Sequence, residues 1–228
     1  MSTLKVNEIF YSVQGESTRA GLPCVFIRLT GCHLRCGYCD TEYAFHEGSR
    51  KTVDQVIDEA QRVGGGCTLY EITGGEPLLQ KGVHELMKQL CDLGKTVLLE
   101  TSGACDISVC DPRVIRIMDL KTPGSGEVER NLWSNIQHLT RRDEVKLVLC
   151  SREDYTWARG VIEEYGLADR VAAVLVSAVH ETPPGKELPG STGLSLHDLA
   201  QWVLQDHLPV RIQTQLHKLI WEPNARGV

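Results

Sequence analysis

Three cysteines lie within eight positions of the segment GCHLRCGYCDT, at Cys32, Cys36 and Cys39. Cysteine thiolates are strong ligands for zinc and for iron–sulfur clusters. A structural zinc site normally takes four ligands from two separated pairs, and only one such arm is present. His33 or His46 could complete a Cys₃His zinc site. Three thiolates alone suit a cubane iron–sulfur cluster in which one iron has no protein ligand.

The other six cysteines are scattered, at Cys24, Cys67, Cys91, Cys105, Cys110 and Cys150. The N-terminus MSTLKVNEIF shows no charged region followed by an apolar one, so we expect no secretory signal and a cytoplasmic protein. In that reducing compartment thiols serve metal or redox chemistry, or pack as small hydrophobes, rather than form disulfides. The proximity of Cys105 to Cys110 leaves a second metal site open.

Composition narrows the class of protein. The chain has 228 residues, of which 42% are hydrophobic and 24% charged, values typical of a globular fold, and we expect one domain over residues 1–228. A net charge of −6 without a Lys/Arg run argues against a nucleic-acid partner. No apolar run approaches the ~20 residues that cross a bilayer, so we expect no membrane association.

Short apolar runs alternate with longer amphipathic ones, which predicts an α/β fold with a parallel sheet. Predicted strands cover 25–29, 67–73, 96–100, 114–120, 144–149, 171–177 and 209–214. Predicted helices cover 52–63, with Thr52 as N-cap, 78–93, 128–140, 152–166 and 194–206. About six such repeats form either a partial barrel or an open doubly wound sheet, and both collect functional groups at the C-terminal strand ends. The Pro- and Gly-rich segment 180–192 is predicted to be a loop or lid.

Polar loops follow three of these strands. TGC ends at the first cysteine, TGGEP spans 73–77, and ETSG spans 100–103. Alone, TGGEP is an ordinary strand-to-helix turn with Pro77 in the first helical turn. Upstream, IFYSVQGES and Arg28 offer amide, carboxylate and guanidinium groups that suit a pterin- or guanine-like ring and a substrate carboxylate. The plainer interpretation is a surface turn and an ion-paired arginine.

Cys32-x₃-Cys36-x₂-Cys39, with Tyr38 before the last cysteine and TGGEP downstream, resembles the signature of the radical S-adenosylmethionine (SAM) superfamily. The resemblance implies a partial (β/α)₆-type TIM barrel and a [4Fe–4S] cluster on a loop over 31–46, whose open iron binds SAM. It also implies SAM contacts from Tyr38, Cys39, Asp40, Gly74, Gly75, Glu76, Gly103, Ser125, Ser177 and His180.

With YSVQGE, FIRLTGC, CDT and QLHK, the chain is similar to the 7-carboxy-7-deazaguanine synthase family of queuosine biosynthesis. That family converts 6-carboxy-5,6,7,8-tetrahydropterin by radical ring contraction with loss of ammonia. The similarity implies Mg²⁺ at Thr41, a homodimer, a reducing donor such as flavodoxin, and substrate contacts from Val13, Gln14, Gly15, Glu16, Arg28, Thr101 and His217. Alone, Thr41 is a helix-cap or turn residue and His217 a surface histidine. This chain also continues past QLHK to NARGV.

Two alternatives remain at this stage. An activating enzyme that makes a glycyl radical on a partner protein would share the cysteine loop and GGEP, but it has no need for the QGE turn and Arg28. A non-enzymatic zinc-binding module would need only the cysteine loop.

Overall fold

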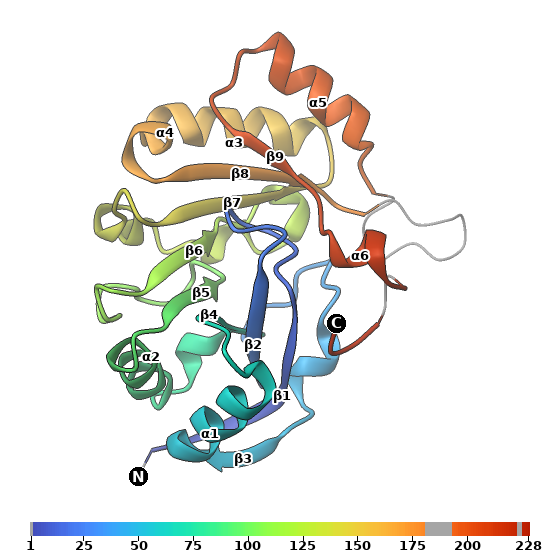
Figure 1. Cartoon of the computed structure of the whole chain (residues 1–228). Coiled ribbons are helices and arrows are strands. Elements are labelled where there is room, and N and C mark those ends of the chain that lie inside the picture. The colour runs from blue at the N-terminus through green and yellow to red at the C-terminus, as the bar shows by residue number, and fades with distance from the viewer. Residues whose placement is uncertain (1, 181–192, 223–224) are drawn as a thin grey trace.

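The computed structural model describes residues 2–180, 193–222 and 225–228, and these contain a nine-stranded sheet that curves into a partial barrel (Figure 1). The strand order is β3-β1-β2-β4-β5-β6-β7-β8-β9, in which β2 and β4 to β9 are parallel, while β1 pairs antiparallel with both β2 and β3. The predicted strands are confirmed as β2 Pro23–Leu29, β4 Leu69–Gly74, β5 Thr96–Thr101, β6 Ile115–Asp119, β7 Glu144–Leu149, β8 Ala173–Ala178 and β9 Arg211–Gln213.

Two strands were missed by sequence analysis, β1 Thr3–Val13 and β3 Ser49–Thr52. They form an antiparallel edge in which Thr3 pairs with Thr52, while the rest of β1 pairs with β2. The hairpin joining β1 to β2 carries the QGE turn, so this edge places that turn at the rim of the barrel.

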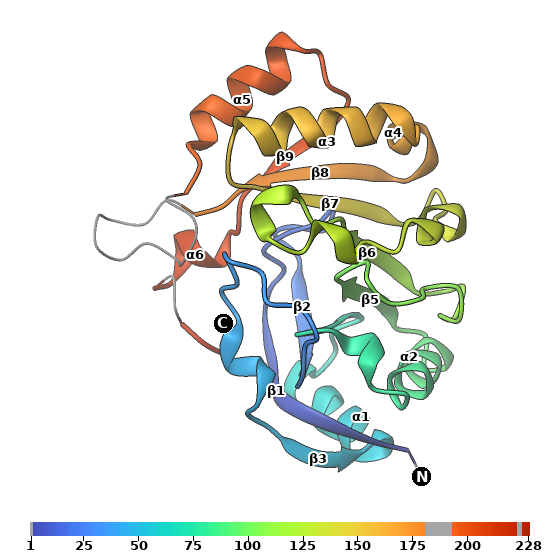
Figure 2. The same cartoon turned by 180° about the vertical axis from the view of Figure 1, so that it is seen from behind.

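Helices cover the outer face of the sheet, as both views show (Figures 1 and 2). They are α1 Val53–Gly64, α2 Val83–Asp92, α3 Arg152–Glu164, α4 Leu167–Arg170 and α5 Leu196–Gln205, while α6 His217–Ile220 lies near the hairpin tip. Thr52 caps α1 in a capping box with Gln55, as predicted. In the described part of the chain, no helix has the length and apolarity needed to cross a membrane.

The helix predicted over 128–140 is wrong. The chain there forms two 3₁₀ helices, Val128–Arg130 and Trp133–His138. Asn131 bonds the backbone of Lys121, and Asn135 donates to the carbonyl oxygens of Gly103 and Cys105. Asparagine side chains that bind backbone in this way compete with helical hydrogen bonds. Further 3₁₀ turns are Glu42–Phe45, Pro77–Leu79 and Pro123–Ser125, and the second of these delays the start of α2 to Val83.

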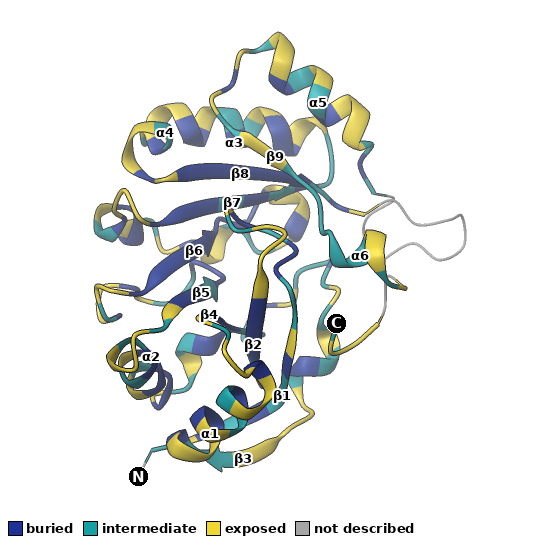
Figure 3. Ribbon diagram, in the orientation of Figure 1, coloured by how far each residue is buried: buried dark blue, intermediate teal, exposed yellow. Residues whose placement is uncertain are grey.

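The large apolar core lies between the sheet and its helices, and the central strands β2 and β4 to β8 are accordingly mostly buried, while the edge strands β1, β3 and β9 are more exposed (Figure 3). A smaller cluster fills the inside of the curve and includes Phe10, Phe26, Leu98, Ile117 and Leu175. Two positions further along each of four strands, the inward side chain becomes polar, at Arg28, Glu100, Asp119 and Ser177. Because side chains alternate between faces with a period of two, these polar groups form a layer directly above the smaller apolar cluster, which we call the apolar plug.

Candidate functional site

A cavity of about 290 Å³ opens above the plug, at the C-terminal ends of the parallel strands. It is the place where α/β barrels carry their active sites. The predicted residues that line it are Val13, Gln14, Gly15, Glu16, Arg28, Cys32, Cys36, Tyr38, Cys39, Asp40, Thr41, Gly74, Gly75, Thr101, Ser177, His180 and His217. The fold thus brings the cysteine loop, the QGE turn and the QLHK segment to one cavity. Of the lid predicted over 180–192, only His180 lies within the described residues.

The cysteine loop is anchored to the TGGEP turn through backbone contacts. The Glu76 N–H donates to the Gly31 carbonyl oxygen at 2.8 Å. A Cβ on Gly75 would lie 2.3 Å from that oxygen and 2.6 Å from the Cys32 Cβ. Gly75 therefore permits a close approach that no other residue allows.

Gly75→Ala is expected to displace the cysteine loop, because neither contact lies at the end of a flexible side chain. We expect the reconstituted variant to lose most of its iron and sulfide while it stays folded, as measured by iron assay and circular dichroism. Gly66→Ala is the matched control, since a Cβ there meets nothing within 4 Å. Normal iron content in Gly75→Ala would show that the loop does not depend on this approach.

Three predicted SAM contacts lie behind the cavity wall instead of lining it. The Glu76 carboxylate is 1% exposed and accepts hydrogen bonds from the Thr101 hydroxyl and the Ser102 N–H. The Ser125 carbonyl oxygen accepts from Gly37 N–H at 3.0 Å. Gly103 is also outside the lining. These residues hold the loops that form the wall.

The QGE turn and the QLHK segment pack against each other. The Leu216 N–H donates to the Gly15 carbonyl oxygen at 3.1 Å, and a Cβ on Gly15 would lie 3.0 Å from the His217 Nδ1. Burial lowers the pKa of His217, so its imidazole is neutral near pH 7. A neutral imidazole offers one donor and one acceptor to a ligand.

The C-terminal tail also reaches this cavity, which sequence analysis left open. Ala225, Gly227 and Val228 line it, and the C-terminus lies beside the segment that follows the cysteines (Figure 1). Arg226 anchors the tail, with its guanidinium 3.8 Å from the centre of the Tyr43 ring and 2.9 Å from Glu47. No motif in the sequence marks this contact, because it depends on how the chain returns to its first half.

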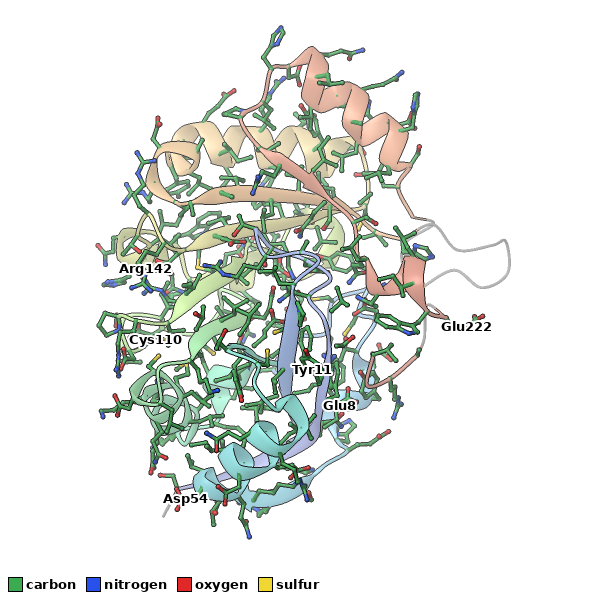
Figure 4. All side chains as sticks on the ribbon, in the orientation of Figure 1. Glu8, Tyr11, Asp54, Cys110, Arg142 and Glu222 are labelled. Carbon is green, nitrogen blue, oxygen red and sulfur yellow. The ribbon has the colours of Figure 1, made fainter. Side chains whose placement is uncertain are left out.

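Arg28 is both an ion-paired arginine and a cavity-lining residue, so it fits both interpretations drawn from the sequence. Its Nε donates to Glu8 at 2.7 Å, and the Tyr43 hydroxyl donates to the same carboxylate at 3.0 Å. Glu8 extends from β1 (Figure 4). The Arg28 side chain is 17% exposed and lines the cavity, so its remaining N–H groups can bind an anionic ligand.

Asp40 connects the cysteine loop to the C-terminal segment. Its carboxylate accepts from the Thr41 hydroxyl at 2.9 Å, from Lys218 at 2.7 Å and from Gln215 at 3.2 Å. Desolvation opposes the charge on Asp40, but the Lys218 ammonium holds the pKa of that carboxyl well below its ordinary value. The contact holds Thr41, which lines the cavity and whose hydroxyl can still accept or coordinate through its oxygen.

A group of buried charges forms the floor of the cavity and was missed by sequence analysis: Glu71, Glu100 and Lys146. Lys146 lies 2.9 Å from both Glu100 and Glu16, and Glu71 accepts a hydrogen bond from the Gln14 side chain. The available signal was a charged residue inside an otherwise apolar strand, as in YEI, LLE and VKL.

The lining suits a multi-atom cofactor. The Tyr38 hydroxyl and Asp119 Oδ1 are buried at this site with no partner among the described residues, and such atoms normally bond to a ligand or water. Burial raises the pKa of Cys39 to about 11 and also raises that of Cys36, so ligation would displace thiol protons. In the described ranges no three His, Cys, Asp or Glu side chains could hold a single metal ion. Cys110, considered from the sequence for a second metal site, lies on the opposite side of the view from Glu222 (Figure 4).

Comparison with known proteins gives consistent matches. Residues 26–119 match the model of the Radical SAM superfamily. The chain is 42% identical to the 7-carboxy-7-deazaguanine synthase of Chlorobaculum tepidum, over 99% of this chain and 97% of that protein. It is 41% identical to the enzyme of the same name from Koribacter versatilis, over 99% and 100%.

Solved structures show the same fold. The crystal structure of QueE from Escherichia coli matches with a TM-score of 0.70 and 19% identity, over 93% of this chain and 94% of that one. Streptococcus suis SuiB bound to S-adenosylmethionine matches with a TM-score of 0.56 over 81% of this chain and 48% of that one. The predicted α/β partial barrel is therefore confirmed.

Proposed function

The chain belongs to the 7-carboxy-7-deazaguanine synthase family of radical SAM enzymes, and on that basis we propose that it converts 6-carboxy-5,6,7,8-tetrahydropterin into 7-carboxy-7-deazaguanine with loss of ammonia. The observation that carries the proposal is that the cysteine loop, the QGE turn with Arg28, and QLHK line one cavity. Neither a glycyl-radical activating enzyme nor a zinc-binding module needs that combination. We propose that residues 1–228 act as one domain.

The family uses a [4Fe–4S] cluster, SAM and Mg²⁺. Cys32, Cys36 and Cys39 would hold the cluster, which together with SAM supplies a 5′-deoxyadenosyl radical. Tyr38, Asp40, Gly74, Gly75, Ser177 and His180 line the cavity and would contact SAM, while Glu76, Gly103 and Ser125 hold the loops that carry those contacts. The protein's own contribution is to position SAM and the substrate next to each other, and the polar layer inside the barrel provides the groups for this.

The substrate would lie between the QGE turn and the tail. The Arg28 guanidinium would bind the substrate carboxylate. Thr101, whose hydroxyl donates a hydrogen bond to Glu76 in the free protein, would lie against the substrate ring. Val13, Gln14, Gly15 and Glu16 would meet the ring edge, and neutral His217 would close the site from the C-terminal side. Small-molecule specificity follows from these few polar groups in a concave site.

Thr41 would hold Mg²⁺ through its hydroxyl, so Thr41→Ala is expected to raise the Mg²⁺ concentration for half-maximal product formation roughly tenfold or more, at least the effect of losing a group that only orients a ligand. Cleavage of SAM should stay close to the wild-type rate, because the cysteines are untouched. Thr41→Ser keeps the hydroxyl and is the matched control. Equal loss of SAM cleavage and product in Thr41→Ala would make Thr41 structural.

We propose a homodimer that works in the cytoplasm with a small reducing protein such as flavodoxin as electron donor. The dimer and the donor follow the resemblance drawn from the sequence motifs, and the compartment follows from the need of an iron–sulfur cluster for reducing surroundings. Size-exclusion chromatography with light scattering tests the dimer. Product formation with reduced flavodoxin in place of dithionite tests the donor.

The function is tested by incubating anaerobically reconstituted, reduced protein with SAM, Mg²⁺ and 6-carboxytetrahydropterin. We expect 7-carboxy-7-deazaguanine and ammonia in equal amounts, identified by mass spectrometry and absorbance. SAM cleavage without a deazapurine product, at saturating pterin, would refute this substrate.

A further inference from the structure

The floor of the cavity holds more carboxyl groups than cations. Glu16 and Glu100 share one ammonium, that of Lys146, at 2.9 Å each. Among the described residues, the Glu71 carboxylate accepts a hydrogen bond from the side-chain amide of Gln14 alone. Three acids thus face one cation in a site closed below by apolar side chains.

Glu71 and Glu100 are neighbours on the same face of adjacent strands. Glu71 pairs with Leu98 in the β4–β5 register, and Glu100 follows Leu98 by two positions. Glu71 is 5% exposed, and both side chains line the cavity. Each has one oxygen that accepts no hydrogen bond from the described residues. Neither of these oxygens is among the fully buried unpartnered atoms of the described residues, so both are open to donors from a ligand in the cavity.

The arrangement also gives the ligand a direction. In the β2–β4 register Phe26 pairs with Glu71 and Arg28 with Thr73, so Arg28 lies one inward position nearer the open end than Glu71. Arg28 shares its layer with Glu100, which extends from the other side of β4. A ligand with a carboxylate at one end and N–H donors at the other fits with the carboxylate at Arg28 and the donors at Glu71 and Glu100, across β4. The reverse placement would set a carboxylate against two acids.

We propose that Glu71 and Glu100 are specificity-determining residues that accept hydrogen bonds from the adjacent ring N–H and amino group of the substrate's 2-amino-4-pyrimidinone ring. A carboxylate receives two parallel N–H donors in fork geometry, which is the pattern this ring edge presents. The assignment rests on the proposed function for the identity of the ligand. It deepens that function by naming the groups that select and orient the ring.

The free protein compensates the excess charge with protons. Burial, and then the neighbouring Glu100, raise the pKa of Glu71 to about 8. Burial raises the pKa of Glu100 to about 7 against the opposing pull of Lys146. The other charged groups facing them are Glu16 and Asp119. Burial also opposes the charge on Glu16, but Lys146 holds its pKa below the ordinary value.

Ligand donors would lower these raised pKa values, so binding releases protons. Below about pH 8 the free carboxyl pair carries protons that the complex lacks. The affinity for the ligand therefore rises with pH until Glu71 is ionised in the free protein. Above that pH the affinity becomes constant.

The test is calorimetric titration of reconstituted protein with SAM and Mg²⁺, but no reductant, so that 6-carboxytetrahydropterin binds without turnover. Titrations in phosphate and in Tris near pH 7 should reveal release of about one proton per ligand. Glu71→Gln should weaken binding about tenfold or more and reduce the release, because the amide keeps the Gln14 contact but loses the charge. An analogue lacking the 2-amino group should bind wild type correspondingly more weakly, and Glu71→Gln should discriminate less.

Asp58→Asn, on the exposed side of α1, is the matched acid-to-amide control and should bind like wild type. Binding to wild type without proton release, or unchanged affinity and discrimination in a folded Glu71→Gln or Glu100→Gln, would overturn the assignment. If the variants do not fold, the wild-type proton release alone decides. A wild type that binds no pterin and forms no deazapurine refutes the proposed function instead, so the two failures are distinguishable.

Discussion

Cys36→Ala is expected to leave the protein folded but without product, SAM cleavage or cluster iron after anaerobic reconstitution. Cys36 comes from a loop without helix or strand, so its loss removes a ligand and little packing. A cubane left with two protein thiolates is not retained by a loop of this kind. Iron and sulfide assays and visible absorbance measure the cluster, and circular dichroism checks the fold.

Cys91→Ala is the matched control for this prediction. Cys91 lies on α2, on the outer layer, and does not line the cavity. It should keep full iron content and activity. Full iron content in Cys36→Ala would show that the cluster, if present, uses other ligands.

Asp143→Ala is expected to lower the free energy of unfolding by about 3–5 kcal/mol, the range found when one partner of a buried ion pair is removed. Asp143 is 0% exposed and its carboxylate accepts from Arg116 Nη2 at 2.6 Å, from Arg116 Nε at 3.0 Å and from Thr140 N–H at 2.7 Å. Without it the Arg116 guanidinium on β6 is buried without a carboxylate partner. Urea unfolding of the cluster-free protein measures the loss.

Asp92→Ala provides the exposed comparison. Asp92 pairs with Lys88 at 2.7 Å and with Arg113 at 2.8 Å, but its side chain is 46% exposed. Exposed ion pairs contribute little to stability, so this variant should unfold close to wild type. Similar losses of unfolding free energy in both variants would mean that burial does not determine how much the Arg116–Asp143 ion pair contributes to stability.

Local patterns predicted most of the architecture. The parallel strands and four of the five predicted helices are present near their predicted places, because periodicity, caps and glycines act within a few residues. Where a distant contact competed, prediction failed: Asn135 bonds carbonyl oxygens about 30 residues away and replaces a helix with 3₁₀ turns. The edge strand β3 was missed because it is short and polar, and its pairing with β1 spans nearly 50 residues.

The sequence by itself determined the family, the cysteine loop and the QGE and QLHK segments, because these are contiguous residues whose spacing carries the chemistry. Only the tertiary structure decided that the Glu76 carboxylate bonds to the cavity wall from outside the lining. It also decided that Arg226, held by Tyr43 and Glu47, places the C-terminal tail at the cavity. It alone assembled Glu71, Glu100 and Lys146 into one floor. Each of these charges is a single residue in an apolar strand, and they meet only because parallel strands turn alternate side chains toward a shared interior.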